Sequence, residues 1–468
     1  MAGVDGRSDL HVRVVSRRLV KASDSSIEPH VLTVSNLDLL PRTIPVAMFC
    51  VYPKPPAADF DAVVAGFEAG LPSLLDHFFP FAGRIATNPS SGLPEVHCHN
   101  QGAELVVGEA TSVPLASLDY GNMSASLRRI QLPYAAADVA LSVQVVSFAC
   151  GGFTVAWCTN HVLVDGSALS LLVSAWSELA RSGTLAVGSR PNHGRSVLRP
   201  RAPPSYSASL DEAFTPLDAE RQVNVLTAKQ SFVERLYYVE ASDIARLREA
   251  ASRGDGERAT RVQAVSAYLW KALARVVGSA DAHCRMGWFV DGRRRLTAPA
   301  LRAATRGYVG NVTTFAVREA SVEEVLRMPL PEVAAMVREA IAAPAYDEHF
   351  QELVDWVEEH KTERYVETAT LGLGSPLLSV SAFASFPIDT DFGFGHAAMA
   401  TPTSTPARLC SGFFQITAQP GVDGPWIVNA FVWPRLAAAL ESDEPRVLKP
   451  VTAEYLGFLP SQVRYSRL

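Results

Sequence analysis

The chain has 468 residues, more than the roughly 250–300 at which a single hydrophobic core stops growing, so its length favours two lobes. Hydrophobic residues make up 48% and charged residues 19% of the composition, which excludes an intrinsically disordered chain. The formal net charge of -6 argues against a nucleic-acid or anionic-membrane partner, because such partners select basic surfaces.

The first part of the chain predicts alternating strands and helices. His11–Val20 and Val46–Tyr52 have strand patterns, and apolar residues recur at helical spacing from Phe60 to Leu75. Leu141–Ser147 and Gly152–Cys158 are rich in β-branched and aromatic residues, which predicts two neighbouring strands. We therefore expect this part to form an α/β lobe.

A strand-to-helix passage follows the second of these strands. After Asp165-Gly166 the apolar residues recur with the period of a helix, as far as Leu179. His161 therefore lies in a short connection between a strand and a helix. Side chains in such a position project into a cleft more often than into the core.

A proline-rich connection divides the chain. Residues 182–222 carry several prolines and few apolar repeats, which predicts a long exposed linker. Helical patterns around 242–251 and 262–277 follow it, together with strand-like segments at 285–290, 311–317, 377–384, 412–418 and 426–432. We predict an N-terminal lobe of residues 1–181, a crossover linker of residues 182–222 and a C-terminal lobe of residues 223–468, in an α/β fold of two similar lobes.

The cysteines and the two ends of the sequence indicate the cellular compartment of the protein. The six cysteines form no C-x-x-C pair, which favours free thiols in the core of an intracellular protein. The first 21 residues contain no apolar block of the kind that a signal peptide needs, and no run is long enough to span a membrane. The last three residues, Ser466-Arg467-Leu468, match a variant of the peroxisomal import tripeptide, and an ordinary frayed tail is the alternative.

The segment His161-Val162-Leu163-Val164-Asp165 is the first candidate site. A neutral histidine there can take a proton from a hydroxyl or amine, because its ordinary pKa lies near working pH. A structural, hydrogen-bonded histidine is the alternative. No G-x-S-x-G elbow is present, so a serine triad lacks its nucleophile, and Asp165 is interpreted as a structural ion-pair partner.

Two further patterns have simpler interpretations. Asp391-Phe392-Gly393-Phe394-Gly395 begins like the magnesium-binding motif of protein kinases, but the other kinase motifs are missing. Its glycines favour a tight turn that anchors two phenylalanines. His97 and His99 would share one face of a strand, but two ligands do not make a metal site, so no metal is expected.

The motifs together resemble the plant BAHD acyltransferases, a family of plant specialised metabolism. That family carries a histidine-x-x-x-aspartate motif in mid-chain and an Asp-Phe-Gly-Trp-Gly motif towards the end. Both occur here in that order, with Phe394 in place of the tryptophan. The resemblance extends through residues 74–84, 144–152, 290–295 and 307–311.

The resemblance implies two lobes that are each similar to chloramphenicol acetyltransferase, with a tunnel between them. Acyl-CoA would enter as co-substrate from one side and an alcohol or amine acceptor from the other, and no bound cofactor or metal is implied. His161 would be the general base midway along the tunnel. Asp165 would pair with Arg293, and the turn with Asp391, Gly393 and Gly395 would be structural. A monomer is the family expectation.

The substrates are less well defined. Arg253, Arg258 and Arg261 precede the helix containing Trp270 and are candidates for binding the CoA phosphates, with a solvated charged loop as the alternative. Family members that use shikimate have an arginine where this chain has Ser385, which cannot form a bidentate pair with a carboxylate. We therefore expect a neutral alcohol or an amine as acceptor.

The acyl group and the reaction class leave alternatives open. A peroxisomal location would favour benzoyl-CoA as donor, alongside a hydroxycinnamoyl donor. Outside acyl transfer, two functions remain: a non-catalytic binding partner on the same scaffold, and a CoA-independent lyase that uses the same histidine.

Overall fold

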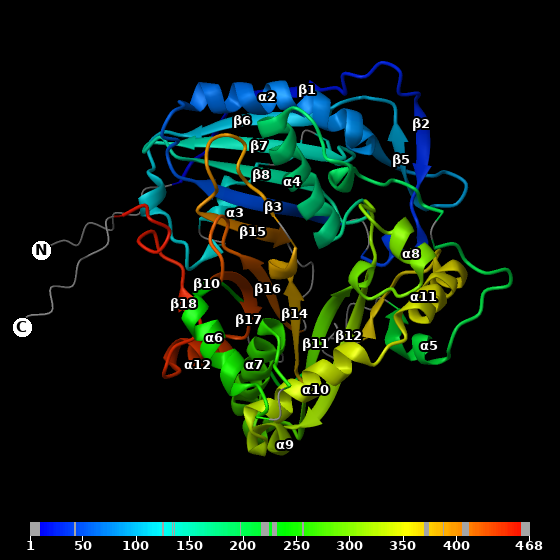
Figure 1. Cartoon of the computed structure of the whole chain (residues 1–468), viewed down its shortest axis with the longest axis vertical. Coiled ribbons are helices and arrows are strands. Elements are labelled where there is room, and N and C mark those ends of the chain that lie inside the picture. Colours follow the sequence, from blue (N-terminus) through cyan, green and yellow to red (C-terminus); the bar gives the residue numbers. More distant parts are fainter. Residues whose placement is uncertain are drawn as a thin grey trace, which may run out of the picture.

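The computed structural model describes residues 10–41, 44–123, 126–132, 134, 136–196, 198–216, 224–226, 232–254, 257–368, 374–386, 388–404 and 411–459. Its two large sheets lie one above the other in Figure 1, each with its own helices. The prediction of a two-lobed α/β fold is confirmed.

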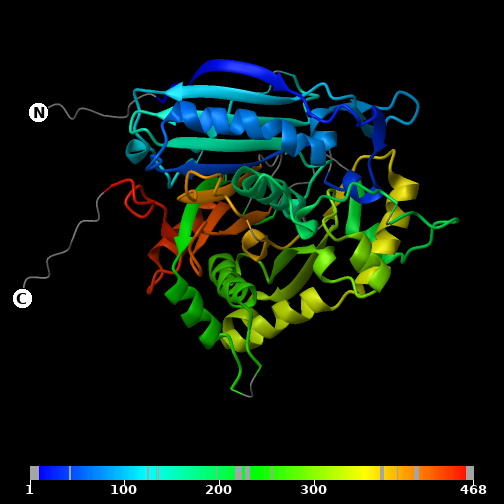
Figure 2. The same ribbon diagram turned by 45° about the horizontal axis from the view of Figure 1, so that its top comes forward.

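The first lobe is built on a six-stranded sheet with the order β1-β6-β7-β8-β3-β15. Helices α2 (Phe60–His77) and α4 (Gly166–Ser182) pack on it, and Figure 2 shows α2 in front of the strands, running roughly along them. Every residue of β8 is buried, so both faces of this strand are covered. The strands in sheet order are β1 (Arg13–Val20), β6 (Ala103–Ala110), β7 (Leu141–Phe148), β8 (Phe153–Asn160), β3 (Pro45–Tyr52) and β15 (Met399–Ser404).

The second lobe is built on a seven-stranded sheet with the order β12-β11-β14-β16-β17-β10-β18. One face of this sheet is covered by α6 (Ala241–Ala250), α7 (Arg261–Val277), α10 (Leu330–Ala342) and α12 (Pro434–Ser442). The strands in sheet order are β12 (Thr313–Ser321), β11 (His283–Asp291), β14 (Leu377–Ala382), β16 (Gly412–Ala418), β17 (Trp426–Val432), β10 (Val233–Val239) and β18 (Lys449–Pro450).

Smaller elements surround the two sheets. A three-stranded sheet has the order β2-β5-β4, and β9 pairs with β13. These strands are β2 (His30–Thr33), β5 (Pro94–Cys98), β4 (Arg84–Thr87), β9 (Phe214–Pro216) and β13 (Tyr365–Glu367). The remaining α-helices are α1 (Asn36–Leu39), α3 (Leu127–Ile130), α5 (Ser209–Ala213), α8 (Pro299–Ala304), α9 (Val322–Arg327) and α11 (Tyr346–His360).

The structure corrects the predicted lobe boundaries. Strand β15 pairs with β3 of the first sheet, and Phe392 and Ala400 belong to the first lobe's core, although residues 223–468 were assigned to the second lobe. The Asp391–Gly395 turn contacts Ser177 and Trp157 of the first lobe, so the chain has already crossed back before β15. The linker is not wholly exposed either, because Leu198 and Leu210 are buried and α5 and β9 lie within residues 182–222.

Cysteine burial agrees with the core prediction for four residues and corrects it for one. Cys50, Cys98, Cys158 and Cys284 are buried free thiols, whereas Cys150 is exposed in the turn between β7 and β8. Cys410 lies outside the described residues. Within the described ranges, none of the helices has the length and apolar character that a membrane span requires.

Candidate active site

His161 lies where the first sheet meets the second lobe. Strand β8 ends at Asn160 and α4 begins at Gly166, so the predicted strand-to-helix passage is present. The backbone N–H of His161 donates to the carbonyl of Ile44 at 2.8 Å, and the residue is partly exposed. Gly166 permits this arrangement, because a Cβ there would lie 2.3 Å from a ring carbon of Phe383.

Asn311 of the second lobe fixes the orientation of the His161 ring. Its Nδ2 donates to the carbonyl of His161 at 2.9 Å and to Oδ1 of Asp38 at 3.0 Å, so its Oδ1 is the atom that faces Nδ1 of His161, at 3.1 Å. An amide oxygen only accepts, so Nδ1 carries the hydrogen of the neutral ring. Nε2 is then left with its lone pair, and within the described part of the chain it has no hydrogen-bond partner.

Asp38 supports Asn311 from behind. It is fully buried, and its Oδ1 also accepts from the backbone N–H of Asn311 at 2.7 Å. Its Oδ2 accepts from the backbone and hydroxyl of Ser35, both at 2.8 Å, and lies 3.3 Å from Nε of Arg195. The ring of His161 is therefore held by a chain of polar groups from three separate parts of the sequence.

Asp165 and Arg293 come together at the lobe interface. Nη1 of Arg293 donates to Oδ2 of Asp165 at 2.6 Å, and the same oxygen accepts from the backbone of Val312 at 2.9 Å. The other oxygen of Asp165 caps α4 by accepting from Ala168 N at 2.9 Å. Arg293 also bonds Asp291 at 3.0 Å. All these partners are structural, and none places Asp165 behind the His161 ring as in a serine triad.

Burial sets the charges at the site. It lowers the pKa of His161, against the smaller opposing effects of Asp165 and Asn311, so the ring is neutral near pH 7. Burial acts to raise the pKa of Asp165, but the charge of Arg293 and its hydrogen bond outweigh burial, and the pKa is lowered. The site therefore combines a neutral imidazole with a permanent ion pair.

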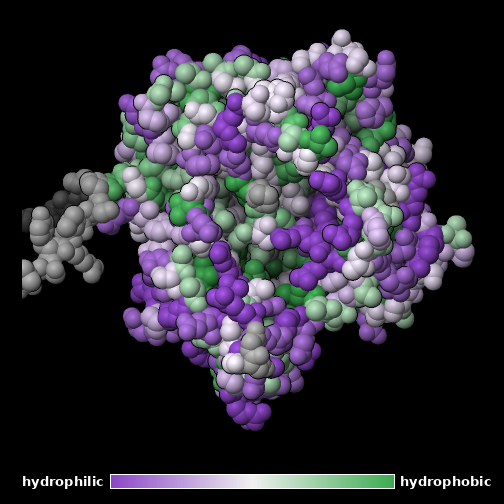
Figure 3. All heavy atoms as spheres, in the orientation of Figure 1, coloured by the Kyte–Doolittle hydropathy of each residue, from purple (hydrophilic) through white to green (hydrophobic). Residues whose placement is uncertain are grey.

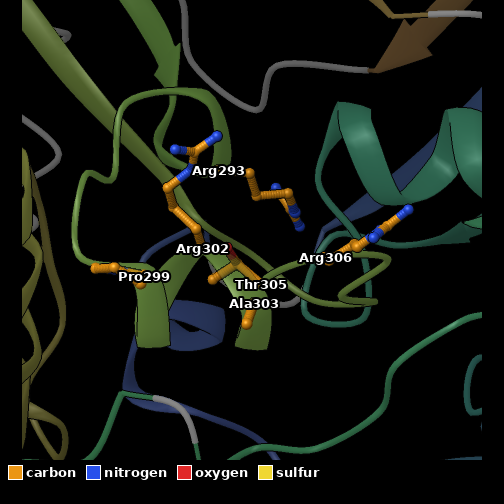
Figure 4. Close-up of a pocket in the computed structure, with 6 residues that line it drawn as sticks. All are labelled: Arg293, Pro299, Arg302, Ala303, Thr305 and Arg306. Atoms are coloured by element: carbon orange, nitrogen blue, oxygen red, sulfur yellow. The ribbon is translucent and has the colours of Figure 1, made fainter.

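The face seen in Figure 1 is hollowed near its centre, where Figure 3 shows hydrophobic residues lying deeper than their hydrophilic surroundings. Beside Arg293 lies a hollow of about 550 Å³, drawn in Figure 4. Its lining includes Arg302 of α8 and Arg306 just beyond that helix, both exposed, but not His161. It is a basic pocket next to the Asp165–Arg293 pair.

The Asp391–Gly395 turn is organised by its own aspartate. Oδ1 of Asp391 accepts from the backbone N–H groups of Gly393 at 2.9 Å and Gly395 at 3.0 Å. Both glycines have positive φ, 93° and 90°, which other residues rarely adopt. The hydroxyl of Ser177 on α4 donates to the carbonyl of Asp391 at 2.7 Å, which ties the turn to the first lobe.

Two aromatic rings anchor this turn. Phe392 is 6% exposed and stacks on Trp157 with ring centroids 5.5 Å apart. Phe394 is partly buried 6.2 Å from the ring of Phe67, and it lies so close to α2 that a Cβ at Gly66 would be 2.9 Å from its ring. The contacts of the turn are with first-lobe core residues, in a different place from the Asn311–His161 contact.

The remaining predicted residues lie apart from His161's polar network. Arg253, Arg258 and Arg261 are exposed in and after the loop between α6 and α7, and Arg261 lies 3.9 Å from Asp423. Ser385 is exposed at the end of a short 3-10 helix, Phe383–Ser385, and its hydroxyl donates to the carbonyl of Ala382 at 3.1 Å.

His97, the candidate metal ligand, has a carboxylate partner of its own. His97 bonds Glu95 through Nε2 at 2.7 Å, and no group of three or more His, Cys, Asp and Glu residues within the described ranges could hold a metal ion. Ser466-Arg467-Leu468 lies outside the described residues.

Sequence reasoning missed the roles of Asn311 and Asp38. Asn311 lies inside a segment that carries the family resemblance, but nothing in its local pattern points to His161, which is 150 residues away. Asp38 lies on the short helix α1, and its only local signal is the capping box that it forms with Ser35.

Comparison with known proteins agrees with the fold. The sequence profile described as "Transferase family" matches residues 10–421. Among solved structures, F. graminearum TRI101 complexed with coenzyme A and T-2 mycotoxin superposes with a TM-score of 0.73, at 15% identity, covering 90% of this chain and 99% of that one. Vinorine synthase superposes with a TM-score of 0.63, at 20% identity, covering 96% and 98%.

Curated relatives are similar along most of their length. Putrescine hydroxycinnamoyltransferase of Oryza sativa subsp. japonica is 28% identical over 429 residues, which cover 85% of this chain and 92% of the relative. Anthranilate N-benzoyltransferase protein 1 of Dianthus caryophyllus is 28% identical over 352 residues, covering 70% and 76%. With the profile match, the two-lobed fold and the histidine at the lobe interface, the chain belongs to the BAHD family of acyl-CoA-dependent O- and N-acyltransferases.

Proposed function

We propose that this enzyme transfers an aromatic acyl group, of the benzoyl or hydroxycinnamoyl type, from acyl-CoA to an alcohol or amine, with His161 as general base. The observation that carries the proposal is the geometry of one ring. Asn311 holds Nδ1 of His161 at 3.1 Å, so Nε2 is free to take a proton. The relatives named for hydroxycinnamoyl and benzoyl transfer support the donor class.

The proposed mechanism needs one base and two adjacent substrates. Nε2 of His161 takes the proton as the acceptor oxygen or nitrogen attacks the thioester carbonyl, which gives a tetrahedral oxyanion. Collapse breaks the carbon–sulfur bond, and the imidazolium returns the proton to the departing CoA thiolate. Binding both substrates together increases the rate, because the two reactants are already in contact in the site and need not collide in solution. The Asn311 contact keeps the ring in the productive tautomer throughout.

The surroundings support narrower proposals. We place the two substrates on opposite sides of His161, in a tunnel between the lobes. The exposed cations Arg253, Arg258 and Arg261 are proposed to meet the CoA phosphates. Ser385 stands on the proposed acceptor side, where a hydroxyl suits a neutral alcohol or an amine better than a carboxylate.

A peroxisomal location is part of the proposal. The closing tripeptide Ser466-Arg467-Leu468 supports it, and a peroxisome would bring the enzyme close to benzoyl-CoA. A tag fused behind Leu468 should move the protein to the cytosol. Finding the untagged protein outside peroxisomes would contradict the proposed location and would leave the proposed reaction unaffected.

The experiment on the reaction mixes purified protein with matched pairs of acyl-CoA and acceptor and follows free thiol with a chromogenic reagent. Benzoyl-CoA, p-coumaroyl-CoA and acetyl-CoA are each combined with benzyl alcohol and with putrescine. We expect thiol release that requires an acceptor and is fastest with an aromatic donor. Release with none of the pairs, alongside saturable binding of acyl-CoA, would instead indicate a non-catalytic partner, and turnover of an acceptor without CoA would indicate a lyase.

A further inference from the structure

The second sheet has a face turned toward the first lobe, opposite its helices. On β14, Leu378 and Val380 join the core under the helices, so Ser379 and Ser381 lie on the other face. On β12, Thr313 shows where that face points, since its hydroxyl donates to Asp165 of the first lobe at 3.2 Å. We call this face the inner wall.

Three phenylalanines on the inner wall form a group of their own. Phe315 lies two residues after Thr313, so both side chains share a face, and Phe289 pairs with Phe315 across the ladder. The ring centroids of Phe289 and Phe315 lie 4.9 Å apart, and those of Phe289 and Phe413 lie 5.8 Å apart. All three are partly exposed, and none belongs to the hydrophobic cores. Aromatic rings in this state are available to pack on another ring.

A hydroxyl without a partner lies among these rings. Ser379 pairs with Gly287 on one side and Phe413 on the other, and the Phe315 ring fills the space over Gly287, where a Cβ would lie 2.2 Å from it. Ser379 is 2% exposed, and within the described residues its Oγ has no hydrogen-bond partner. An unpaired buried hydroxyl is costly, so one flanked by aromatic rings indicates a missing polar group from outside the chain.

The inner wall also carries a second unpaired atom. Ser381, Gln415 and Asn429 are consecutive partners across β14, β16 and β17. Asn429 is fully buried, and its Oδ1 has no hydrogen-bond partner among the described residues. A polar row thus continues from the aromatic group across the sheet.

The wall lies close to the candidate base. Asn311, which holds His161, immediately precedes β12, and Thr313 bonds the aspartate of the same motif. Phe315 is two residues further, about 7 Å along the strand. The inner wall is thus joined to the His161 network through Asn311 and the first residues of β12.

We propose that the inner wall binds an aromatic ring that carries a hydroxyl group, with the ring packed on Phe289, Phe315 and Phe413 and the hydroxyl bonded to Oγ of Ser379. This inference rests on the proposed function and narrows it: the enzyme distinguishes hydroxylated from plain aromatic substrates. The hydroxylated ring can come from the acyl donor or from the acceptor, and the test separates these two sources.

The test measures discrimination by wild type and by Ser379→Ala. In one arm, p-coumaroyl-CoA and cinnamoyl-CoA are compared with a fixed acceptor; in the other, 4-hydroxybenzyl alcohol and benzyl alcohol are compared with benzoyl-CoA. We expect wild type to prefer the hydroxylated member of the pair in one arm. Ser379→Ala should reduce the ratio of the kcat/KM for the hydroxylated member to that for the plain member about tenfold. Ser442→Ala, an exposed serine on α12 beyond the far face, is the matched control and should leave both ratios unchanged.

Each outcome decides the proposal. Narrowing in the first arm assigns the hydroxyl to the donor, and narrowing in the second assigns it to the acceptor. Unchanged ratios in both arms overturn it. Phe413→Leu should weaken both members of a pair equally, because it removes ring contact and leaves the hydroxyl contact in place; a change confined to the hydroxylated member would contradict the assigned roles.

A stability measurement separates recognition from a structural role. Because Oγ of Ser379 has no partner to lose, Ser379→Ala should not lower the thermal midpoint. A clear fall would show a structural hydroxyl and overturn the proposal. If no pair releases thiol, the proposed function fails on its own. Calorimetric binding of p-coumaroyl-CoA and cinnamoyl-CoA then tests the inner wall. Ser379→Ala must still bring the dissociation constants of these two thioesters closer together.

Discussion

The His161 segment and the Asp391–Gly395 turn are the two motifs that the sequence makes conspicuous, and they are built in opposite ways. The first is held from the other lobe: Asn311 orients the ring, and Arg293 pairs with Asp165. The second is held by its own aspartate and by rings of the first lobe's core. The motif held across the interface leaves Nε2 of His161 free, whereas the aspartate of the second motif uses Oδ1 to close its own turn.

This contrast separates chemistry from architecture. Changes at His161 should lower the rate and leave the fold intact, and changes at Asn311 should act chiefly on the rate. Changes in the turn should lower stability and leave the rate of folded enzyme intact. Asp165 lies in the first motif, but we predict that its replacement lowers stability more than rate, because every partner of its carboxylate is structural.

The largest expected effect is at His161. Replacing it with glutamine removes the base, so kcat for thiol release should fall about 10²–10⁴-fold while the unfolding midpoint stays within error. His97→Gln, a change at a histidine bonded to Glu95 on a different sheet, should leave kcat unchanged. A His161→Gln enzyme with wild-type kcat would remove the base from the mechanism.

The next effect is on stability. Asp165→Ala leaves the guanidinium of Arg293 buried with one partner fewer, which should lower the free energy of unfolding by about 3–5 kcal/mol. Equilibrium denaturation in urea measures this loss. Adding Arg293→Met should recover part of it, because the unpaired buried charge is then gone; a double variant less stable by the full sum would mean that the two residues act independently.

Asn311→Ala should act mainly on the rate. Without its Oδ1 the ring of His161 loses its fixed tautomer, and kcat should fall about 10²-fold while KM for the acyl-CoA changes little. Steady-state kinetics with varied acyl-CoA separates the two parameters. A rise in KM with kcat preserved would show that Asn311 serves binding and not the orientation of the base.

The smallest effect is in the turn. Gly393 has φ of 93° and open space around its missing Cβ, so Gly393→Ala strains the backbone alone and should cost about 1–2 kcal/mol of stability. Gly254→Ala is the control, since Gly254 has the same open space without a positive φ. A loss of kcat in folded Gly393→Ala enzyme would place the turn in the chemistry.

Local structure followed from local sequence. The change of period after Asp165 predicts a helix, and α4 begins at Gly166. The predicted strands at 412–418 and 426–432 coincide with β16 and β17. Such elements could be predicted because burial of one face imposes its period on adjacent residues.

Long-range pairing could not be predicted in this way. Strand β15 contains Pro402, which weakens a strand prediction, and it is tolerated because β15 lies at the edge of the first sheet. Asn311 contacts His161 across the lobe interface, and the hydrophobic pattern of neither segment predicts that contact. The unpaired hydroxyl of Ser379 could not be predicted either, because the lack of a partner depends on how the neighbouring strands of the inner wall pack around it.

The most direct test of the account is the pH dependence of kcat/KM. The neutral His161 ring is the base, so protonation removes activity, and burial lowers its pKa below the ordinary histidine value near 6.5. With benzyl alcohol as acceptor, which does not titrate in this range, we predict that kcat/KM stays level as pH falls through 6.5 and drops only at lower pH. This limb should be absent in the residual activity of His161→Gln. A limb at or above pH 6.5, or one that persists in His161→Gln, would contradict the central claim that the imidazole of His161 accepts the proton.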